Sequence, residues 1–147
     1  MRCFVFLSAL VLGIIVARGA SFEAPVVDAR SIKSESYQVE IDGQPLFVTK
    51  FRNLSYASFA FTGQVAVAVR ATAPVREFNL SPHAAGIPAT ATGSVVTFRL
   101  DRPQHLVLTI NGGEKLFLFA ESIEPNAPKP GMPGVTSVLD FGVDPTG

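Results

Sequence analysis

The feature that most constrains the fold is a two-residue alternation of apolar and polar side chains, which recurs from residue 37 onward. Tyr37, Val39 and Ile41 alternate with polar residues, as in a strand that buries one face in a core. From residue 37 onward no segment shows the apolar spacing of a helix. The segments predicted as strands are 37–41, 46–51, 56–61, 64–69, 76–80, 96–100, 106–110 and 116–119. About seven or eight short strands at this spacing predict an all-β fold, an antiparallel β-sandwich.

Turn signals separate these segments. Asp42-Gly43 and Asn111-Gly112-Gly113 are predicted hairpin turns, because glycine accepts the positive φ that a tight turn requires. Thr62-Gly63 joins 56–61 to 64–69 as the next pair of strands. Asp101-Arg102-Pro103 makes a turn between 96–100 and 106–110.

Two segments receive a more specific prediction. Residues 64–69 place valines on one face and alanines on the other; since both faces are apolar, this strand is expected inside the sandwich rather than at its rim. The prolines between Ala73 and Thr92 exclude a central strand there. This stretch is predicted to form an edge strand around 76–80, followed by a loop.

The N-terminus has the order of a secretory signal peptide over residues 1–20. A positive start at Met1-Arg2 precedes an apolar run from Cys3 to Ala17 and then small residues, with cleavage predicted after Gly19 or Ala20. The run is shorter than the roughly 20 residues of a membrane helix, although an uncleaved signal anchor is the alternative. The protein is therefore expected to be secreted or extracellular, or periplasmic if its source is bacterial.

The exported chain is expected to carry no disulfide and no nucleic-acid site. Cys3, the single cysteine, lies in the signal peptide, so packing has to stabilise the domain. Removing Arg2 and Arg18 leaves ten basic side chains against twelve acidic ones, a net charge of −2. With no basic stripe and no later apolar span, neither nucleic acid nor a membrane is expected as a partner after signal cleavage.

The composition changes after residue 123. Residues 124–134 contain four prolines and two glycines and are predicted to form a semi-rigid linker. Residues 135–147 begin another strand-like run. The predicted organisation is a signal peptide (1–20), an N-terminal segment (21–36), a β-sandwich (37–123), the linker (124–134) and the start of a further domain (135–147).

No catalytic, metal or cofactor site is predicted from the residues. The serines lie in no nucleophile elbow, and His83 (in the proline-bounded loop) and His105 (at a strand start) lack metal-ligand spacing. The carboxylates are predicted at solvated positions, with no pair singled out for glycoside hydrolysis; they are Glu35, Glu40, Asp42, Glu77, Asp101, Glu114, Glu121 and Glu124. Asp140-Phe141-Gly142 matches a kinase motif, but the glycine-rich loop, strand lysine and catalytic loop that a kinase needs are absent from the sequence.

Two weaker signals concern carbohydrate. Asn53 and Asn79 each begin an N-x-S sequon, and both are candidate N-glycosylation sites if the host is a eukaryote and the asparagines are exposed. The twelve phenylalanines and two tyrosines, without tryptophan, are expected to lie in the core more than on a sugar-binding face. A binding face nevertheless remains an alternative.

The tail resembles a known structural element. Residues Ser137–Gly147 are similar to the start of the right-handed parallel β-helix of pectate-lyase-type glycosidases, polygalacturonase-like or dextranase-like (glycoside hydrolase families 28 or 49). The matching positions are Asp140, Phe141, Gly142, Asp144 and Gly147. The preceding strands resemble the β-sandwich that stands ahead of the helix in some secreted polysaccharide hydrolases.

The resemblance implies a non-catalytic flanking or capping domain. The catalytic aspartates of those families lie on middle turns of the β-helix, so the chain is expected to be C-terminally truncated and not itself to hydrolyse a polysaccharide. Its implied partners are the downstream β-helix catalytic domain of the same polypeptide and a polysaccharide, and the expected role is to shield the exposed first edge of the helix. The alternatives are a free-standing secreted carbohydrate- or protein-binding module and, more weakly, a complete small enzyme.

Overall fold

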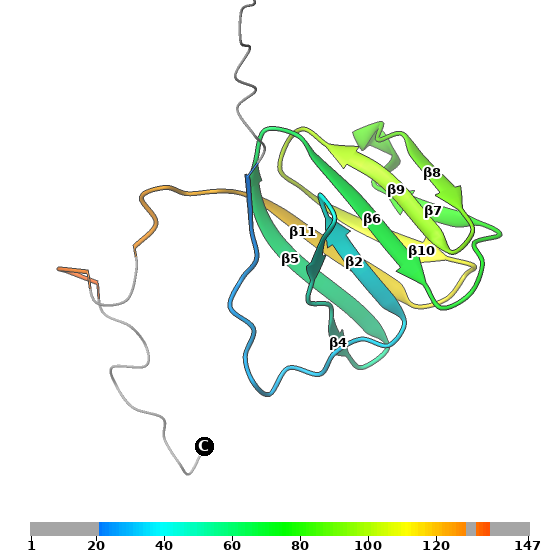
Figure 1. Ribbon diagram of the computed structural model, residues 1–147, viewed down its shortest axis with the longest axis horizontal. Coiled ribbons are helices and arrows are strands. Elements are labelled where there is room, and N and C mark those ends of the chain that lie inside the picture. Colours follow the sequence, from blue (N-terminus) through cyan, green and yellow to red (C-terminus); the bar gives the residue numbers. More distant parts are fainter. Residues whose placement is uncertain (1–20, 129–131, 136–147) are drawn as a thin grey trace, which may run out of the picture.

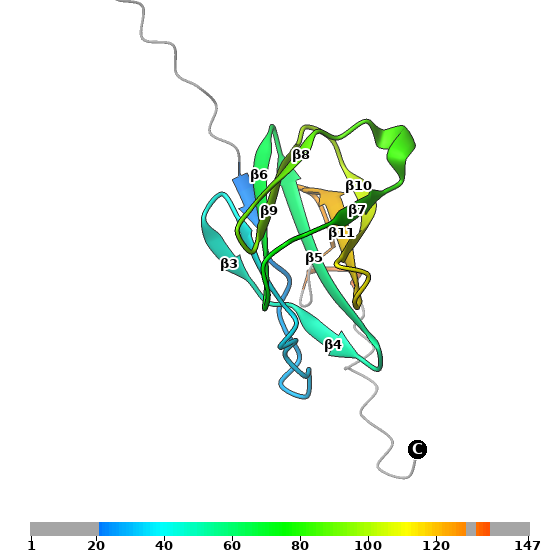
Figure 2. The same ribbon diagram turned by 90° about the vertical axis from the view of Figure 1, so that its right-hand side faces the viewer.

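Two β-sheets pack face to face in the computed structural model, which describes residues 21–128 and 132–135 (Figure 1). One sheet has six strands in the order β1-β5-β11-β10-β7, with β4 also paired to β5, and the other has five in the order β3-β2-β6-β9-β8. The strands are β1 (Ser21–Glu23), β2 (Tyr37–Ile41), β3 (Gln44–Leu46), β4 (Thr49–Phe51), β5 (Leu54–Thr62), β6 (Val65–Ala71), β7 (Phe78–Ser81), β8 (Ala89–Thr92), β9 (Val95–Leu100), β10 (Gln104–Ile110) and β11 (Lys115–Ser122), and the 3-10 helix η1 is His83–Ala85. The predicted all-β sandwich is confirmed, and Figure 2 shows its two layers.

The core forms where the inner faces of the two sheets meet. In β2, Tyr37, Val39 and Ile41 are buried and the residues between them are exposed, so the alternation that predicted the strand also decides which side chains face the other sheet. The same alternation brings β5, β10 and β11 inner residues such as Phe59 and Leu106 into one continuous cluster. Each such side chain contributes about 1.5–3 kcal/mol on burial.

The two predicted hairpin turns are confirmed. Asp42 and Gly43 have φ of 49° and 77° and join β2 to β3, with Ile41 opposite Gln44. The second turn joins β10 to β11. Its Asn111 side chain also accepts hydrogen bonds from the backbone N–H groups of Arg76 (2.8 Å) and Glu77 (3.2 Å), which ties the turn to the segment before β7.

The predicted return strand 46–51 is wrong as a single strand. Its residues divide between β3 in the five-stranded sheet and β4 in the six-stranded sheet. Leu46 and Val48 are both buried, with exposed fractions of 7% and 2%, because the chain crosses from one sheet to the other at this point. An alternating pattern continues through such a crossing, and therefore does not reveal it.

The prediction that 56–61 and 64–69 form a pair is also wrong. In the described part of the chain β5 and β6 are not neighbours, because the Thr62-Gly63 turn carries the chain from the six-stranded to the five-stranded sheet. The turn at 101–103 carries it back, from β9 to β10. Strands on either side of a short turn can bury their inner faces against each other across the core as well as pair edge to edge.

The stretch from Ala73 to Thr92 is predicted correctly in part. The expected edge strand is β7, whose partner among the described strands is β10 alone. The expected loop is wrong for its last residues, since β8 pairs with β9 from Ala89 opposite Phe98 to Thr92 opposite Val95. Pro88 immediately precedes β8, and an edge strand tolerates proline there because that backbone position need not donate to a ladder.

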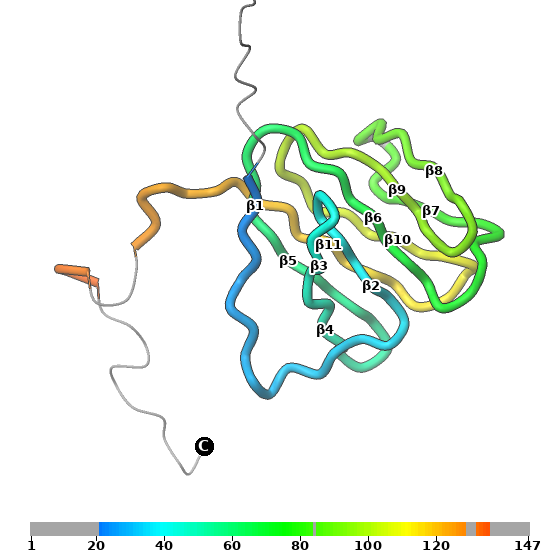
Figure 3. The backbone as a smooth tube through the Cα atoms, in the orientation of Figure 1, coloured from blue at the N-terminus to red at the C-terminus, as the bar shows by residue number. Residues whose placement is uncertain are grey.

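One strand pair is parallel in a fold predicted to be antiparallel. β11 runs parallel to β5, from Lys115 opposite Leu54 to Ser122 opposite Phe61. The other edge of β5 is covered by β4 and β1. Figure 3 shows residues 24–36 running from β1 along this edge before they turn into β2. Within residues 21–128 and 132–135, no helix has the length and apolar character needed to cross a membrane.

Candidate functional site

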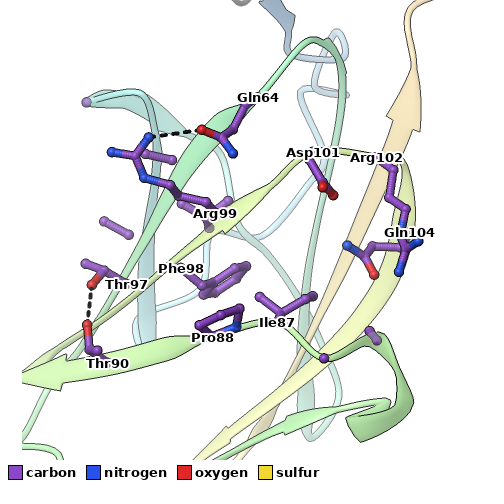
Figure 4. Close-up of a pocket in the computed structure, with 16 residues that line it drawn as sticks. Gln64, Ile87, Pro88, Thr90, Thr97, Phe98, Arg99, Asp101, Arg102 and Gln104 are labelled. Carbon is purple, nitrogen blue, oxygen red and sulfur yellow. Dashed lines mark hydrogen bonds between the residues drawn. The ribbon is translucent and has the colours of Figure 1, made fainter.

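A groove of about 700 Å³ lies on the outer surface of the five-stranded sheet, where β8 begins (Figure 4). β8 starts at Ala89, opposite Phe98, whereas β9 continues for two more residues to Leu100. The end of β9 therefore has no strand beside it on this edge in the described structure. Residues 85–88 and the turn at 101–104 line the space that is left.

Small side chains form the floor of the groove. Ala66 lies opposite Arg99 and Ala68 opposite Thr97, and both alanines are half-buried on the outer face of β6. The prediction that β6 is an interior strand is confirmed, because it lies between β2 and β9. The alanines are nevertheless outside the core, since each sheet of a sandwich packs only one face against the other.

Three apolar residues, Ile87, Pro88 and Phe98, form the middle of the groove lining, which we call the apolar wall. Figure 4 shows Ile87, Pro88 and Phe98 close together, with polar side chains around them. Phe98 belongs to the core, and Ile87 packs against that core while also lining the groove. The wall is therefore held by the same packing that holds the sandwich.

The rim of the groove is polar. Arg99 donates a hydrogen bond to Gln64 (3.2 Å), and the hydroxyls of Thr90 and Thr97 are 3.1 Å apart. Asp101, Arg102 and Gln104 contribute polar side chains at the other end. Two guanidinium groups and one carboxylate give the rim a net charge of +1.

The groove has the chemistry of a binding site more than of a hydrolytic one. Most glycosidases need two carboxyl groups that flank the scissile bond, and among the described residues that line the groove Asp101 is the single carboxylate. No group of three or more histidine, cysteine, aspartate or glutamate side chains in the described structure could hold a metal ion.

Glu114 corrects the prediction that the carboxylates are all solvated. Its side chain is 15% exposed and forms an ion pair with Lys50 of β4. Its carboxylate also accepts hydrogen bonds from Ser55 and from Ser36 (3.2 Å), and Ser34 and Ser55 share a hydrogen bond of 2.7 Å. We call these five residues the Glu114 cluster.

The cluster fixes the charge of Glu114. Burial by itself raises the pKa of this carboxyl group, but the hydrogen bonds from Lys50, Ser55 and Ser36 and the positive charge of Lys50 outweigh burial and hold the pKa below its usual value. The backbone carbonyl of Glu114 also accepts a hydrogen bond from the Tyr37 hydroxyl. Together with Tyr37, the cluster therefore connects β2, β4 and β5 to the β10–β11 turn, and its role is to stabilise the fold.

Sequence reasoning missed the cluster because its members are far apart in the chain. Glu114 and Lys50 are 64 residues apart, and each is a common surface residue type. One signal was available: Ser55 occupies an inward position in the alternation of β5, where a buried hydroxyl requires a polar partner.

The two histidines are at the surface, as predicted. His83 lies exposed in η1. His105 is exposed on the outer face of β10, with Nε2 2.6 Å from Glu121 Oε1 and its ring edge-on to Phe119.

Both sequon asparagines are exposed, as N-glycosylation requires. Asn53, in the turn between β4 and β5, and Asn79, in β7, are both exposed, so the fold leaves room for a glycan at either position. Their use stays a prediction. The signal peptide (1–20) and the β-helix-like residues Asp140, Phe141, Gly142, Asp144 and Gly147 lie outside the described residues.

A second surface is aromatic. The outer face of the six-stranded sheet carries five large, half-buried apolar side chains, which we call the aromatic face: Leu54, Tyr56, Val107, Phe117 and Phe119. Phe117 lies between Tyr56 and Val107 on the neighbouring strands. The expectation that phenylalanines lie in the core holds for Phe59 and Phe98 but not for the two in β11.

Comparison with known proteins gives a likeness of fold. No protein-family model matches the chain, and a comparison with curated proteins finds no match. Among solved structures, the chain is similar to Dex49A from Penicillium minioluteum, a dextranase, with a TM-score of 0.55 and 11% sequence identity. The similarity covers 73% of this chain and 32% of that chain, so this chain spans about a third of the length of that protein. A similarity at 11% identity shows that the two chains share a fold and shows nothing about a shared activity.

Proposed function

We propose that this chain is the non-catalytic β-sandwich part of a secreted polysaccharide-degrading enzyme, in which it flanks or caps a parallel β-helix. The observation that carries the proposal is the fold shared with Dex49A, a protein of which this chain matches 32%. The resemblance of Ser137–Gly147 to the start of a β-helix supports it independently. Secretion rests on the signal-peptide pattern of residues 1–20.

The non-catalytic role agrees with the placement of the described carboxylates. The groove lining has one carboxylate, Asp101, and Glu114 is held as an ion by Lys50 and by hydrogen bonds from two serines, Ser36 and Ser55, in a structural cluster. A general acid in a glycosidase needs a raised pKa, whereas the pKa of Glu114 is lowered.

The aromatic face is the surface on which the downstream domain packs in this proposal. β11 carries Phe117 and Phe119 and ends at Ser122, two residues before the start of the predicted linker at Glu124. A domain that follows this linker would be tethered to the strand that carries the face. Rings that stand half-exposed on a sheet gain from burial by a second apolar surface, and the first turn of a β-helix needs a cover for its edge.

A specific observation favours a second candidate function, a free-standing carbohydrate-binding module. The groove offers a binding site without any downstream domain. The two candidates differ in what the coding region contains beyond Gly147.

The test of the proposal is the reading frame beyond Gly147, together with an assay of the exported chain. We expect the frame to continue into strand-rich repeats with paired aspartates, and we expect the chain itself to release no sugar from dextran or polygalacturonate. A stop codon immediately after Gly147, or hydrolysis by the chain alone, would overturn the proposal.

Thiol labelling tests the docking surface in the longer polypeptide. Val107→Cys places a thiol on the aromatic face, and Gln38→Cys places one on the exposed outer face of β2 as the matched control. We expect Cys at 107 to react with a thiol reagent much more slowly in the longer polypeptide than in the chain that ends at Gly147, and Cys at 38 to react at the same rate in both, as read by mass spectrometry of the labelled peptides. An unchanged rate at 107 rules out docking on this face.

A further inference from the structure

We propose that the groove on the five-stranded sheet binds a segment of neutral oligosaccharide. This site would give the sandwich its own hold on the polysaccharide, separate from any site of hydrolysis. The biological reason for such a hold rests on the proposed function, whereas the site itself rests on the geometry of the groove.

The groove is preformed. Its floor residues lie on β6 and β9, which pair along their lengths from Val65 opposite Leu100 to Arg70 opposite Val95. Its wall is anchored by Phe98 and Ile87 in the core packing. Because these elements are already ordered, a ligand does not have to pay for ordering them, and a volume of about 700 Å³ lies in the usual range of small-ligand sites.

The inner surface matches the apolar side of a sugar ring. A pyranose presents C–H groups on its ring faces and hydroxyls around its edge. The methyl groups of Ala66 and Ala68, with Ile87 and Pro88, give a low apolar surface on which such a face can lie with loss of water. The two alanines are essential to this shape, because a longer side chain at either position would fill the floor.

The rim matches the hydroxyl edge of the same ring. A hydroxyl both donates and accepts hydrogen bonds, and the rim offers both functions: guanidinium donors on Arg99 and Arg102, a carboxylate acceptor on Asp101, and amides that do both on Gln64 and Gln104. These polar groups stand at both ends of the apolar wall (Figure 4).

The rim lacks the concentrated positive charge that selects an anionic ligand. The carboxylate of Asp101 precedes Arg102 directly in the turn and offsets one of the two guanidinium groups, and a net charge of +1 is small beside the arginine and lysine clusters that select polyanions. We therefore expect the apolar floor and the hydrogen-bonding rim to bind neutral sugars, and polygalacturonate fragments to bind no more tightly.

Titration of the exported chain with defined trisaccharides tests the proposal. The neutral probes are isomaltotriose, cellotriose and xylotriose, and the anionic probe is trigalacturonate. We expect saturable binding of at least one neutral probe, with NMR shift changes at the amides of Ala66, Ala68 and residues 85–87 and none on the aromatic face. Absence of binding by all three neutral probes, tighter binding of trigalacturonate, or shift changes elsewhere would overturn the assignment.

A charge-matched pair of variants places the site. Arg99→Ala with Arg102→Ala removes two rim donors, and we expect the Kd of the bound probe to rise about tenfold. Arg70→Ala with Arg76→Ala removes the same charge from exposed positions that do not line the groove, and should leave the Kd unchanged. An equal effect of both double variants would show that the groove is not the site.

The outcomes separate this inference from the proposed function. If sugar binds in the groove and a stop codon follows Gly147, the sugar site is supported and the flanking role in a larger enzyme is overturned. If the frame continues and no sugar binds, the flanking role is supported and the sugar site is overturned.

Discussion

Glu114 shows how one residue can hold several elements together. Its carboxylate meets Lys50 from β4 and Ser55 from β5, and its backbone carbonyl meets Tyr37 from β2. A partly buried charge is tolerated only while it is paired. Removing the Glu114 carboxylate therefore leaves Lys50 without its ion pair and Ser55 without its hydrogen-bond acceptor. We therefore expect Glu114 to matter for stability more than any exposed carboxylate.

The first prediction follows from the lowered pKa of Glu114. Glu114→Gln should lower the free energy of unfolding at pH 7 by about 1–3 kcal/mol, measured by chemical denaturation. A folded-state pKa below the unfolded value of about 4.3 means that the stabilising contribution is present above that value and is lost as the pH falls through the folded pKa. Acidification below about pH 4.3 should therefore destabilise the wild type more than the variant.

Glu40→Gln is the control for this comparison. Glu40 is exposed on the outer face of β2, so the substitution removes the same charge without breaking the cluster. A pH profile of Glu114→Gln parallel to that of Glu40→Gln would show that the cluster does not carry the effect.

At the scale of the element, the paired strands β4 and β5 show that two phenylalanines can have different roles. Phe59 is 2% exposed and lies opposite Ala120 of β11, with its ring 5.9 Å from that of Phe61. Phe51, in the short strand β4, is 55% exposed with the Arg52 guanidinium over its ring. The two positions share a residue type and differ in burial.

The second prediction uses this difference. Phe59→Ala should cost about 3–5 kcal/mol, because the cavity lies among packed neighbours that cannot close it. Phe51→Ala should cost less than about 1 kcal/mol. Denaturant titration of both variants measures the difference, and a loss of similar size at both positions would mean that β5 is not part of the core as described.

At the scale of the whole molecule, the sandwich has two unlike outer surfaces. The five-stranded sheet presents alanine, threonine and charged side chains around the groove, and the six-stranded sheet presents the aromatic face. One surface is therefore suited to a polar ligand and the other to burial by a second apolar surface.

The third prediction concerns export. β1 begins at Ser21 and pairs with β5, with Phe22 opposite Phe61, so cleavage after Gly19 or Ala20 leaves this strand complete. Mass spectrometry of the protein released by a secreting host should give a mature N-terminus at Ala20 or Ser21. A product that keeps residues 1–20 and stays with the membrane would identify the uncleaved anchor instead.

The sequence by itself determined the secondary structure of most of the sandwich. The alternation in β2, β9 and β10 reports directly which side chains face the core, because the side-chain period of a strand is local. The Asp42-Gly43 and Asn111-Gly112 turns were equally predictable, because the positive φ they need restricts the residue type. The surface positions of His83 and His105 followed from the same local reasoning.

Only the tertiary structure decided which strand lies beside which, and therefore what the surfaces can bind. The crossing at Leu46–Val48, the parallel pairing of β5 with β11 and the strand β8 depend on contacts between distant segments, which local periodicity does not encode. The Glu114 cluster and the groove arise in the same way: Glu114 reaches Lys50 only after the sheets have packed, and Ala66 becomes a floor only beside Arg99. From the sequence alone, the alanines of β6 could be predicted to lie in the core as well as the valines. In the folded protein the valines pack against the other sheet, so Ala66 and Ala68 lie on the outer face and form part of the candidate site.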